Sequence, residues 1–251
     1  MSDERHTPEE SKTSRFFPSP SEASPDGVVC LGGPLVPEVL LDAYRHGIFP
    51  WPQVDETGQV WLLWCSPDPR AIFELSGLHI SQRLRRTLRA GQFQATCDRD
   101  FEGVMRGCAT VSGRQEGTWI TPAMFKAYCR MHELGHAHSV EVWREGELAG
   151  GVYGLGIGGL FAAESMFYRV RDASKVALAH LMAHLQSRGY QLFDIQQLTP
   201  HTERLGAVEI PRGQYLRRLA AVIDLPVTFG EKLEGDVDKN EVGDESKSGG
   251  I

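Results

Sequence analysis

Five segments of the chain show the hydrophobic spacing of an amphipathic helix. Apolar residues recur there every three or four positions, which predicts one buried face on each helix. Prolines, hydroxyl residues and glycines indicate where these helices begin and end, with Thr121 and Ser174 as capping residues. The predicted helices begin near Pro37, Ser81, Thr121, Ser174 and Gln214, and they end near Gly47, Gly91, Gly135, Gly189 and Val222. Residues 48–51 and 64–70 are rich in aromatic residues and prolines, which favours loops.

The spacing changes to period-two alternation in residues 139–143, and two further apolar segments at 148–155 and 160–168 follow across short turns. Alternation predicts strands, and the turn residues between the segments predict an antiparallel meander. Residues 192–196 predict a further strand after a helix, and a strand–helix–strand unit makes that pairing parallel. The sequence therefore predicts an α+β protein whose mixed sheet is flanked by helices.

Charge and composition change this picture mainly at the ends of the chain. The net charge is −7 over 251 residues, and the polar segments 1–15 and 229–251, the second of them acidic, predict disordered tails. Residues 16–70 are then expected to form a small N-terminal α/β domain, and residues 71–228 a larger domain. Acidic tails do not exclude a nucleic acid bound at a local basic patch. The five cysteines lack CxxC spacing, which favours reduced thiols over a disulfide framework or a zinc site. No apolar run is long enough to span a membrane.

Acidic residues interrupt two of the predicted strands. Because strand residues two apart share a face, Asp194 lies beside Gln196 and Leu192, and Glu164 beside Ala162 and Met166. A buried carboxylate is costly unless it is paired, so we expect a cationic substrate as its partner. The alternative is that one of these carboxylates lies at a strand end in solvent.

Aromatic and basic residues give two further signals. Trp51 and Trp119 lie in loop-like segments, which favours the wall of a pocket, although aromatic residues more commonly form core. Four arginines lie on the predicted second helix, opposite Leu84 and Leu88, where they either contact phosphates or form a solvated face. These are Arg83, Arg85, Arg86 and Arg89.

Two familiar motifs occur without the structure that their chemistry requires. His132-Glu-Leu-Gly-His136 matches H-E-x-x-H, but Gly135 ends the predicted helix before the second histidine. A site in which His136 and His138 hold a metal lacks a third ligand. The segment Gly154–Gly159 matches G-x-G-x-x-G, but a strand follows it where a dinucleotide site needs a helix.

Several ordered blocks resemble the leucyl/phenylalanyl-tRNA–protein transferases over about residues 16–222. The blocks are Phe17-Pro-Ser-Pro20, Ala43-Tyr-Arg-His-Gly-Ile-Phe-Pro-Trp51, Ser66-Pro-Asp-Pro-Arg70, Gly117-Thr-Trp-Ile120, residues 132–143, Glu164-Ser-Met-Phe167, Asp172-Ala-Ser-Lys175 and Leu205-Gly-Ala207. The resemblance implies a bacterial cytoplasmic enzyme of the N-degron pathway, which marks proteins for degradation. Such enzymes move Leu, Phe or, less readily, Met from aminoacyl-tRNA to an N-terminal Arg or Lys. It also implies a larger domain like the GCN5-type N-acetyltransferases, and no cofactor or metal.

The resemblance also assigns site residues. The family's Asp–Gln pair corresponds to Asp194 and Gln196, and its acidic site residue corresponds to Glu164. Ala163 replaces a glycine just before Glu164, so it adds a methyl group at the edge of the amino-acid pocket. The remaining pocket residues are implied to be Tyr44, Phe49, Trp51, Trp119, Tyr128, Val152, Phe161, Leu178 and Phe193.

Three other functions compete with this interpretation. An acyl-CoA N-acetyltransferase needs a glycine-containing loop for pyrophosphate, and residues 169–173 before the fourth helix contain no glycine. A non-catalytic tRNA- or degron-binding module predicts tight binding without turnover. A zinc hydrolase predicts a bound metal ion.

Overall fold

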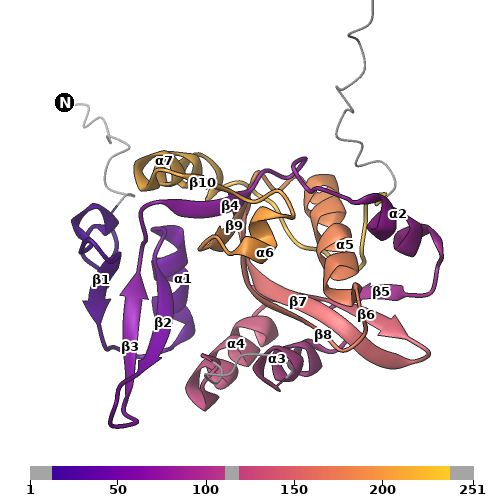
Figure 1. Ribbon diagram of the computed structural model, residues 1–251. Coiled ribbons are helices and arrows are strands. Elements are labelled where there is room, and N and C mark those ends of the chain that lie inside the picture. Colours follow the sequence, from indigo (N-terminus) through magenta and orange to yellow (C-terminus); the bar gives the residue numbers. More distant parts are fainter. Residues whose placement is uncertain (1–12, 111–118, 238–251) are drawn as a thin grey trace, which may run out of the picture.

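The computed structural model describes residues 13–110 and 119–237 and divides their strands between two sheets (Figure 1). The smaller sheet is antiparallel, in the order β1-β3-β2, and it lies with α1 at one end of the molecule. The small N-terminal part consists of η1 (Pro20–Glu22), β1 (Val28–Leu31), α1 (Pro37–Arg45), β2 (Phe49–Val54) and β3 (Val60–Cys65). Pro37 begins α1, and its preceding residue Val36 makes no side-chain capping bond.

Of the two proline-rich segments expected as loops, residues 49–51 belong to strand β2, whereas residues 66–69 form the loop that follows β3. Residues 49–54 and 60–65 pair as the β2–β3 hairpin, with Pro50 opposite Trp64 and Pro52 opposite Leu62. Because β2 is an edge strand, its prolines need no partner on the outer side. The loop prediction was wrong here because sequence alone does not distinguish an edge strand from a loop.

The larger sheet has seven strands, in the order β10-β4-β9-β8-β7-β6-β5. Its strands are β4 (Arg70–Phe73), β5 (Gln94–Cys97), β6 (Ala137–Arg144), β7 (Glu147–Ile157), β8 (Leu160–Tyr168), β9 (Leu192–Gln196) and β10 (Val208–Ile210). Strands β6, β7 and β8 form the expected antiparallel meander, and β8 pairs with β9 in parallel. The mixed sheet predicted from the sequence is therefore confirmed.

Helices cover both faces of this sheet. They are α2 (Gln82–Arg89), α3 (Phe101–Thr110), α4 (Pro122–Glu133), α5 (Ala173–Arg188), α6 (Pro200–Glu203) and α7 (Arg212–Val222). Helices α3 and α4 lie on one face and α5 on the other (Figure 1). Two hydrophobic cores result, one between the sheet and α1, α3, α4 and α7, and one between the sheet and α5. Helix α3 was not predicted from the sequence because it is partly polar, although Asp100 caps it by accepting from the Gly103 N–H at 2.9 Å.

Helix α5 begins two residues earlier than the sequence predicted. Its capping residue is Asp172, in a left-handed conformation with φ of 70°, and Ser174 lies buried inside the first turn. The prediction of Ser174 as the cap was therefore wrong. Residues 169–173 contain no glycine, so the sequence gave no indication of a left-handed residue at Asp172.

The chain after α7 also packs further than expected. Phe229 is buried against His138, His184 and Phe161, and the His184 Nε2 atom lies 2.8 Å from the Phe229 carbonyl oxygen. Residues 229–237 thus lie against the core beneath α5, although the sequence assigned them to a disordered tail. Phe229 was the only aromatic residue in this acidic segment, and the acidic composition of the segment as a whole favoured disorder.

Candidate active site

Asp194 lies in the middle of the larger sheet, and its cationic partner is the side chain of Arg70. The Arg70 guanidinium donates from Nε to Oδ1 at 2.9 Å and from Nη2 to Oδ2 at 2.6 Å. The Tyr215 hydroxyl donates to Oδ2 at 2.9 Å. Asp194 and Arg70 are both almost completely buried, at 0% and 1% exposed. The expectation that a cationic substrate pairs with Asp194 was therefore wrong, because Arg70 already does so.

Arg70 also connects the small sheet to the larger one. Its Nη1 donates to the Gly47 carbonyl oxygen at 2.9 Å, and its guanidinium lies 4.8 Å from the Phe49 ring and 4.4 Å from the Tyr215 ring. Burial alone lowers the pKa of Arg70, but the adjacent Asp194 carboxylate raises it above its usual range. Arg70 thus stays charged, and it fixes Asp194 relative to the segment that carries the aromatic residues.

Gln196 ends β9 in an unusual backbone conformation. Its φ is 60°, in the left-handed region that few residues other than glycine adopt. The Gln196 backbone N–H donates to Asp194 Oδ1 at 2.9 Å, which holds this conformation. The side chain then donates from Nε2 to Glu164 Oε1 at 3.2 Å. Asp194 therefore acts on the site through the placement of Gln196.

Glu164 occupies a β-bulge in β8. Gly154 of β7 pairs with Ala163 and Tyr153 pairs with Ser165, so Glu164 has no partner on β7. The bulge keeps Glu164 on the face of Ala162 but sends Met166 to the opposite face, in the core under α5. The predicted grouping of Glu164 with Met166 was wrong because simple alternation does not hold across a bulge.

Two tyrosines meet at the Glu164 carboxylate. Tyr44 donates to Oε1 at 2.7 Å and Tyr128 donates to Oε2 at 3.0 Å, and the two hydroxyl oxygens lie 2.5 Å apart. Burial raises the pKa of Glu164 to about 7, against the hydrogen bonds from the tyrosines, which lower it. This carboxyl group therefore changes its charge near neutral pH.

The residues expected to form an amino-acid pocket lie in two groups. The first group belongs to the core on the Glu164 side of the sheet, where Trp51 stacks on Trp119 with ring centroids 5.9 Å apart and Phe49 meets Trp51 edge-on at 6.2 Å. Tyr44, Phe49 and Tyr128 are buried in the same core, whereas Trp51 and Trp119 are partly exposed.

The second group packs in the core under α5, on the other face of the sheet. It contains Val152, Phe161, Ala163, Leu178 and Phe193. The Phe161 ring contacts Phe193 at 5.8 Å and Tyr190 at 6.2 Å. The structure therefore does not gather all ten expected residues on one face, and only the first group lies on the Glu164 side.

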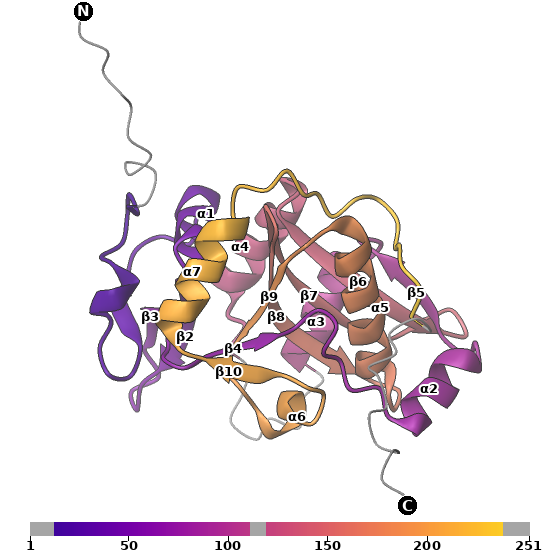
Figure 2. The same cartoon turned by 90° about the horizontal axis from the view of Figure 1, so that it is seen from above.

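The four arginines on α2 are exposed, as the sequence predicted, with Leu84 buried beneath them. Arg83 donates to Asp172 Oδ1 at 2.6 Å, and so ties α2 to the start of α5. Figures 1 and 2 place α2 at the opposite end of the molecule from the small sheet. A ligand that reaches both Glu164 and α2 must extend across the face of the molecule.

The two rejected motifs have the local structures that the sequence predicted. Helix α4 ends at Glu133, and Gly135 has φ of 77°, so His132 and His136 do not share a helix. Gly154 and Gly156 lie inside β7, and Gly158 turns the chain into β8. No group of three or more potential metal ligands occurs among residues 13–110 and 119–237.

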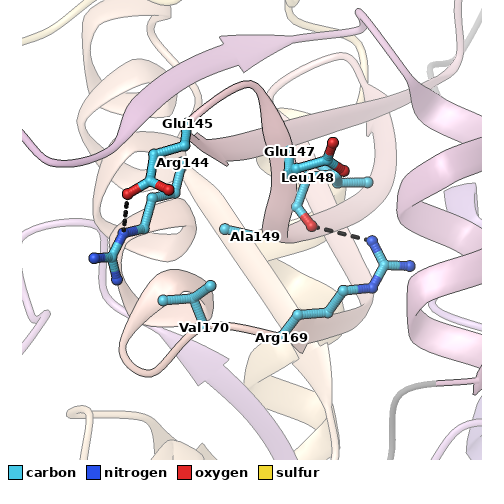
Figure 3. Close-up of a pocket in the computed structure, with 7 residues that line it drawn as sticks. All are labelled: Arg144, Glu145, Glu147, Leu148, Ala149, Arg169 and Val170. Carbon is cyan, nitrogen blue, oxygen red and sulfur yellow. Dashed lines mark hydrogen bonds and ion pairs between the residues drawn. The ribbon is translucent and has the colours of Figure 1, made fainter.

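A hollow elsewhere on the surface shares no residue with this site. It lies at the turn between β6 and β7 (Figure 3), where Arg169 donates to the Leu148 carbonyl oxygen at 3.0 Å. Its lining residues are Arg144, Glu145, Glu147, Leu148, Ala149, Arg169 and Val170.

Sequence reasoning missed the two residues that hold Asp194. Arg70 lies in the matched block 66–70, and a basic residue just before the buried segment 71–73 was a signal for a buried ion pair. Tyr215 lies on the buried face of α7, with nothing in its neighbourhood that points to a carboxylate.

Comparison with known proteins assigns the family. A model of the leucyl/phenylalanyl-tRNA protein transferase family matches residues 72–220, and a model of that family's N-terminal domain matches residues 33–68. The leucyl/phenylalanyl-tRNA–protein transferases of Solidesulfovibrio magneticus and Edwardsiella ictaluri are each 50% identical to this chain. They align over 82% and 81% of this chain and over 82% of their own lengths. The transferase of Magnetococcus marinus is 48% identical over 85% of this chain and 91% of its own.

These relatives define an aminoacyltransferase, the class of enzyme that the site's paired carboxyl and carboxamide groups suit. The chain belongs to the leucyl/phenylalanyl-tRNA–protein transferase family, which confirms the resemblance seen in its sequence. A solved structure of L-PGS from Bacillus licheniformis is 14% identical and covers 61% of this chain and 48% of its own. Its TM-score of 0.34 is too low to assign a fold. None of the helices in the described residues has the length and apolar character needed to cross a membrane.

Proposed function

We propose that the chain transfers Leu or Phe, and less readily Met, from aminoacyl-tRNA to the N-terminal Arg or Lys of acceptor proteins. In the cytoplasm this transfer marks the acceptors for degradation through an N-degron pathway. The observation that carries the proposal is the hydrogen-bonded Glu164–Gln196 pair, in which Glu164 is partly exposed and Gln196 is held in place by the buried Arg70–Asp194 ion pair. The aminoacyl ester is an activated donor, so the reaction needs neither ATP nor a metal ion.

Each residue of the site has a separate role in this proposal. Gln196 and Glu164 contact the attacking amine, and Gln196 orients it by hydrogen bonding because a carboxamide is not a base near neutral pH. Asp194 is a positioning residue, since its lone pairs already accept from Arg70, Tyr215 and the Gln196 backbone. Trp51 and Trp119 form the wall against which the apolar side chain of the donor amino acid packs.

The domain organisation of the proposal follows the sequence expectation. Residues 16–70 form the small domain that supplies Tyr44, Phe49 and Trp51, and residues 71–228 form a catalytic domain like the GCN5-type N-acyltransferases. The parallel β8–β9 pair, which is hydrogen-bonded only as far as Ala162 and Asp194, supports this likeness. Glu164 and Gln196 lie just beyond the paired residues, where the two strands no longer bond to each other.

The arginines of α2 are proposed to contact the tRNA backbone. Arg85, Arg86 and Arg89 are exposed at the end of the molecule away from the small sheet. The tRNA phosphates therefore contact α2 while the aminoacylated end of the tRNA reaches Glu164. The double variant Arg85→Glu, Arg86→Glu raises the KM for aminoacyl-tRNA, and this KM then depends less steeply on salt concentration than in the wild type. The matched control is Arg144→Glu, an exposed arginine at the β6–β7 turn, which leaves both unchanged.

The test of the proposed function is transfer of radiolabelled Leu or Phe from charged tRNA to peptides that begin with Arg, Lys or Ala. We expect product with the first two peptides only. Gln196→Ala lowers the rate, and Asp194→Asn lowers it through the loss of Gln196 placement. No product with any acceptor, beside an active relative as control, contradicts the proposal. Tight binding of charged tRNA without turnover then favours a binding module.

A further inference from the structure

The attacking group of the proposed reaction carries a proton that must leave before the new bond forms. An N-terminal α-amine has a pKa of about 8, so only about one-tenth is neutral at pH 7. An ammonium group has no lone pair for attack on a carbonyl carbon. The site therefore gains rate from a group that takes this proton and stands within hydrogen-bond reach of the amine.

Asp194 does not fit this task. It is 0% exposed, and it accepts four hydrogen bonds, two of them from the permanently charged Arg70. Protonation of Asp194 would leave the Arg70 guanidinium buried without its counter-ion. The oxygens of Asp194 are thus occupied within the protein, and this side chain has no direct contact with a substrate.

Glu164 differs from Asp194 in access and in partners. Its side chain is partly exposed, and its hydrogen bonds within the described residues come from the neutral groups of Tyr44, Tyr128 and Gln196. The charge of Glu164 is therefore not fixed by a salt bridge. It can change during a catalytic cycle without breaking an ion pair.

The oxygens of Glu164, Tyr44 and Tyr128 form a closed ring that has room for one more proton. Three oxygen–oxygen contacts, at 2.5, 2.7 and 3.0 Å, share only the two hydroxyl protons when Glu164 is ionised. With both tyrosines donating to the carboxylate, the 2.5 Å contact between their hydroxyl oxygens has no proton. When Oε2 is protonated, it donates to the Tyr128 oxygen and the Tyr128 hydroxyl turns to donate to Tyr44, so that each of the three contacts holds one proton. The ring thus accepts a proton without any movement of its heavy atoms.

We propose that Glu164 is the general base of the transfer reaction, and that Tyr44 and Tyr128 are positioning residues that hold the proton it receives. This inference rests on the proposed function. The α-ammonium gives one proton to Glu164, and its nitrogen lone pair then forms the bond to the ester carbonyl carbon. The bond from that carbon to the ribose oxygen breaks, and the second amine proton passes to the ribose oxygen as it leaves. Glu164 returns its proton to solvent before the next cycle.

The charged and titratable groups around Glu164 are consistent with this role. Tyr44 faces it from α1, Tyr128 from α4, Asp194 and Gln196 from β9, and Arg70 lies behind Asp194 on β4. The negative charge of Asp194 raises the pKa of Glu164 and the positive charge of Arg70 lowers it, so the buried pair largely cancels. Burial is the main cause that brings the pKa of Glu164 to about 7, close to the pH at which the amine must be deprotonated.

The experiment measures kcat/KM for transfer to a peptide beginning with Arg between about pH 6 and about pH 9, using freshly charged tRNA. Glu164→Gln keeps the shape of the side chain but cannot accept the proton. We expect a loss of about 100-fold near pH 7 that narrows to about 10-fold near pH 9, where the amine is neutral without help. Tyr44→Phe removes a donor to the carboxylate, so the acid limb of the wild-type profile moves to higher pH.

The matched control is Glu141→Gln. Glu141 is also buried and accepts from hydroxyl groups, those of Thr96 and Ser139, but it lies on β6 outside the site. Its variant keeps the wild-type profile. Equal loss in Glu164→Gln at every pH, with a raised KM for the peptide, overturns the inference and makes Glu164 a binding site for the cationic side chain. Absence of transfer by the wild type is a separate result, which overturns the proposed function itself.

Discussion

Asp194 and Glu164 lie at the same site, but Asp194 is fully buried whereas Glu164 is partly exposed, and their hydrogen-bond partners differ. Asp194 pairs with a buried guanidinium that stays charged at every pH of interest, whereas Glu164 meets two phenols and a carboxamide. A charged partner fixes the charge of a buried acid, and neutral partners leave it free to titrate. The first arrangement suits a part of the scaffold, and the second suits a group that exchanges protons with a substrate.

The largest effect is expected from breaking the ion pair. Arg70→Met leaves Asp194 as a buried charge without a cation, which costs about 3–5 kcal/mol of unfolding free energy. Urea denaturation of the variant and the wild type measures this difference. The double variant Arg70→Met, Asp194→Leu removes both charges and regains most of the stability but none of the transfer activity. Full activity in the double variant contradicts a positioning role for Asp194.

A smaller and pH-dependent effect is expected at Glu164. Its pKa is raised from 4.5 to about 7 in the folded protein, so the folded state binds the proton more tightly than the unfolded chain. The stabilisation is complete below pH 4.5 and is lost as the pH rises through 7. It amounts to at most about 3.5 kcal/mol at about 1.4 kcal/mol for each pH unit.

The measurement compares the unfolding free energy of wild type and Glu164→Gln across this range of pH. Glutamine cannot ionise, so the stability advantage of the variant over the wild type grows as the pH rises from 4.5 to 7. A difference that stays constant with pH shows that Glu164 keeps an ordinary pKa.

The hydroxyl of Tyr215 tests how much of the Asp194 environment comes from groups other than Arg70. Tyr215→Phe removes one hydrogen bond to a buried carboxylate and costs about 2 kcal/mol. Because Arg70 still pairs with Asp194, we expect the transfer rate to fall much less than in Arg70→Met. Thermal unfolding gives the stability, and kcat gives the effect on the site. A loss as large as that of Arg70→Met contradicts the dominant role of the ion pair.

The sequence predicted the meander, the parallel β8–β9 pair and the shared face of Asp194 and Gln196, because strands follow local alternation. It failed where long-range packing decides the structure. Pro50 and Pro52 join a strand because that strand is at an edge, and the bulge at Glu164 reverses the alternation after it. The pairing of Asp194 with Arg70 joins residues 124 positions apart, which no local pattern shows.

The smallest effect is expected from an ion pair with the same geometry but a different environment. Arg83 meets Asp172 at 2.6 Å, the same separation as Arg70 and Asp194, but the Arg83 side chain is 53% exposed, against 1% for Arg70. Solvent screens the exposed pair, and Lys175 also reaches Asp172, so Arg83→Ala costs no more than about 1 kcal/mol. Salt added to the wild type weakens this pair and leaves the buried one unaffected. A loss near that of Arg70→Met shows that distance, and not burial, decides the strength of these two pairs.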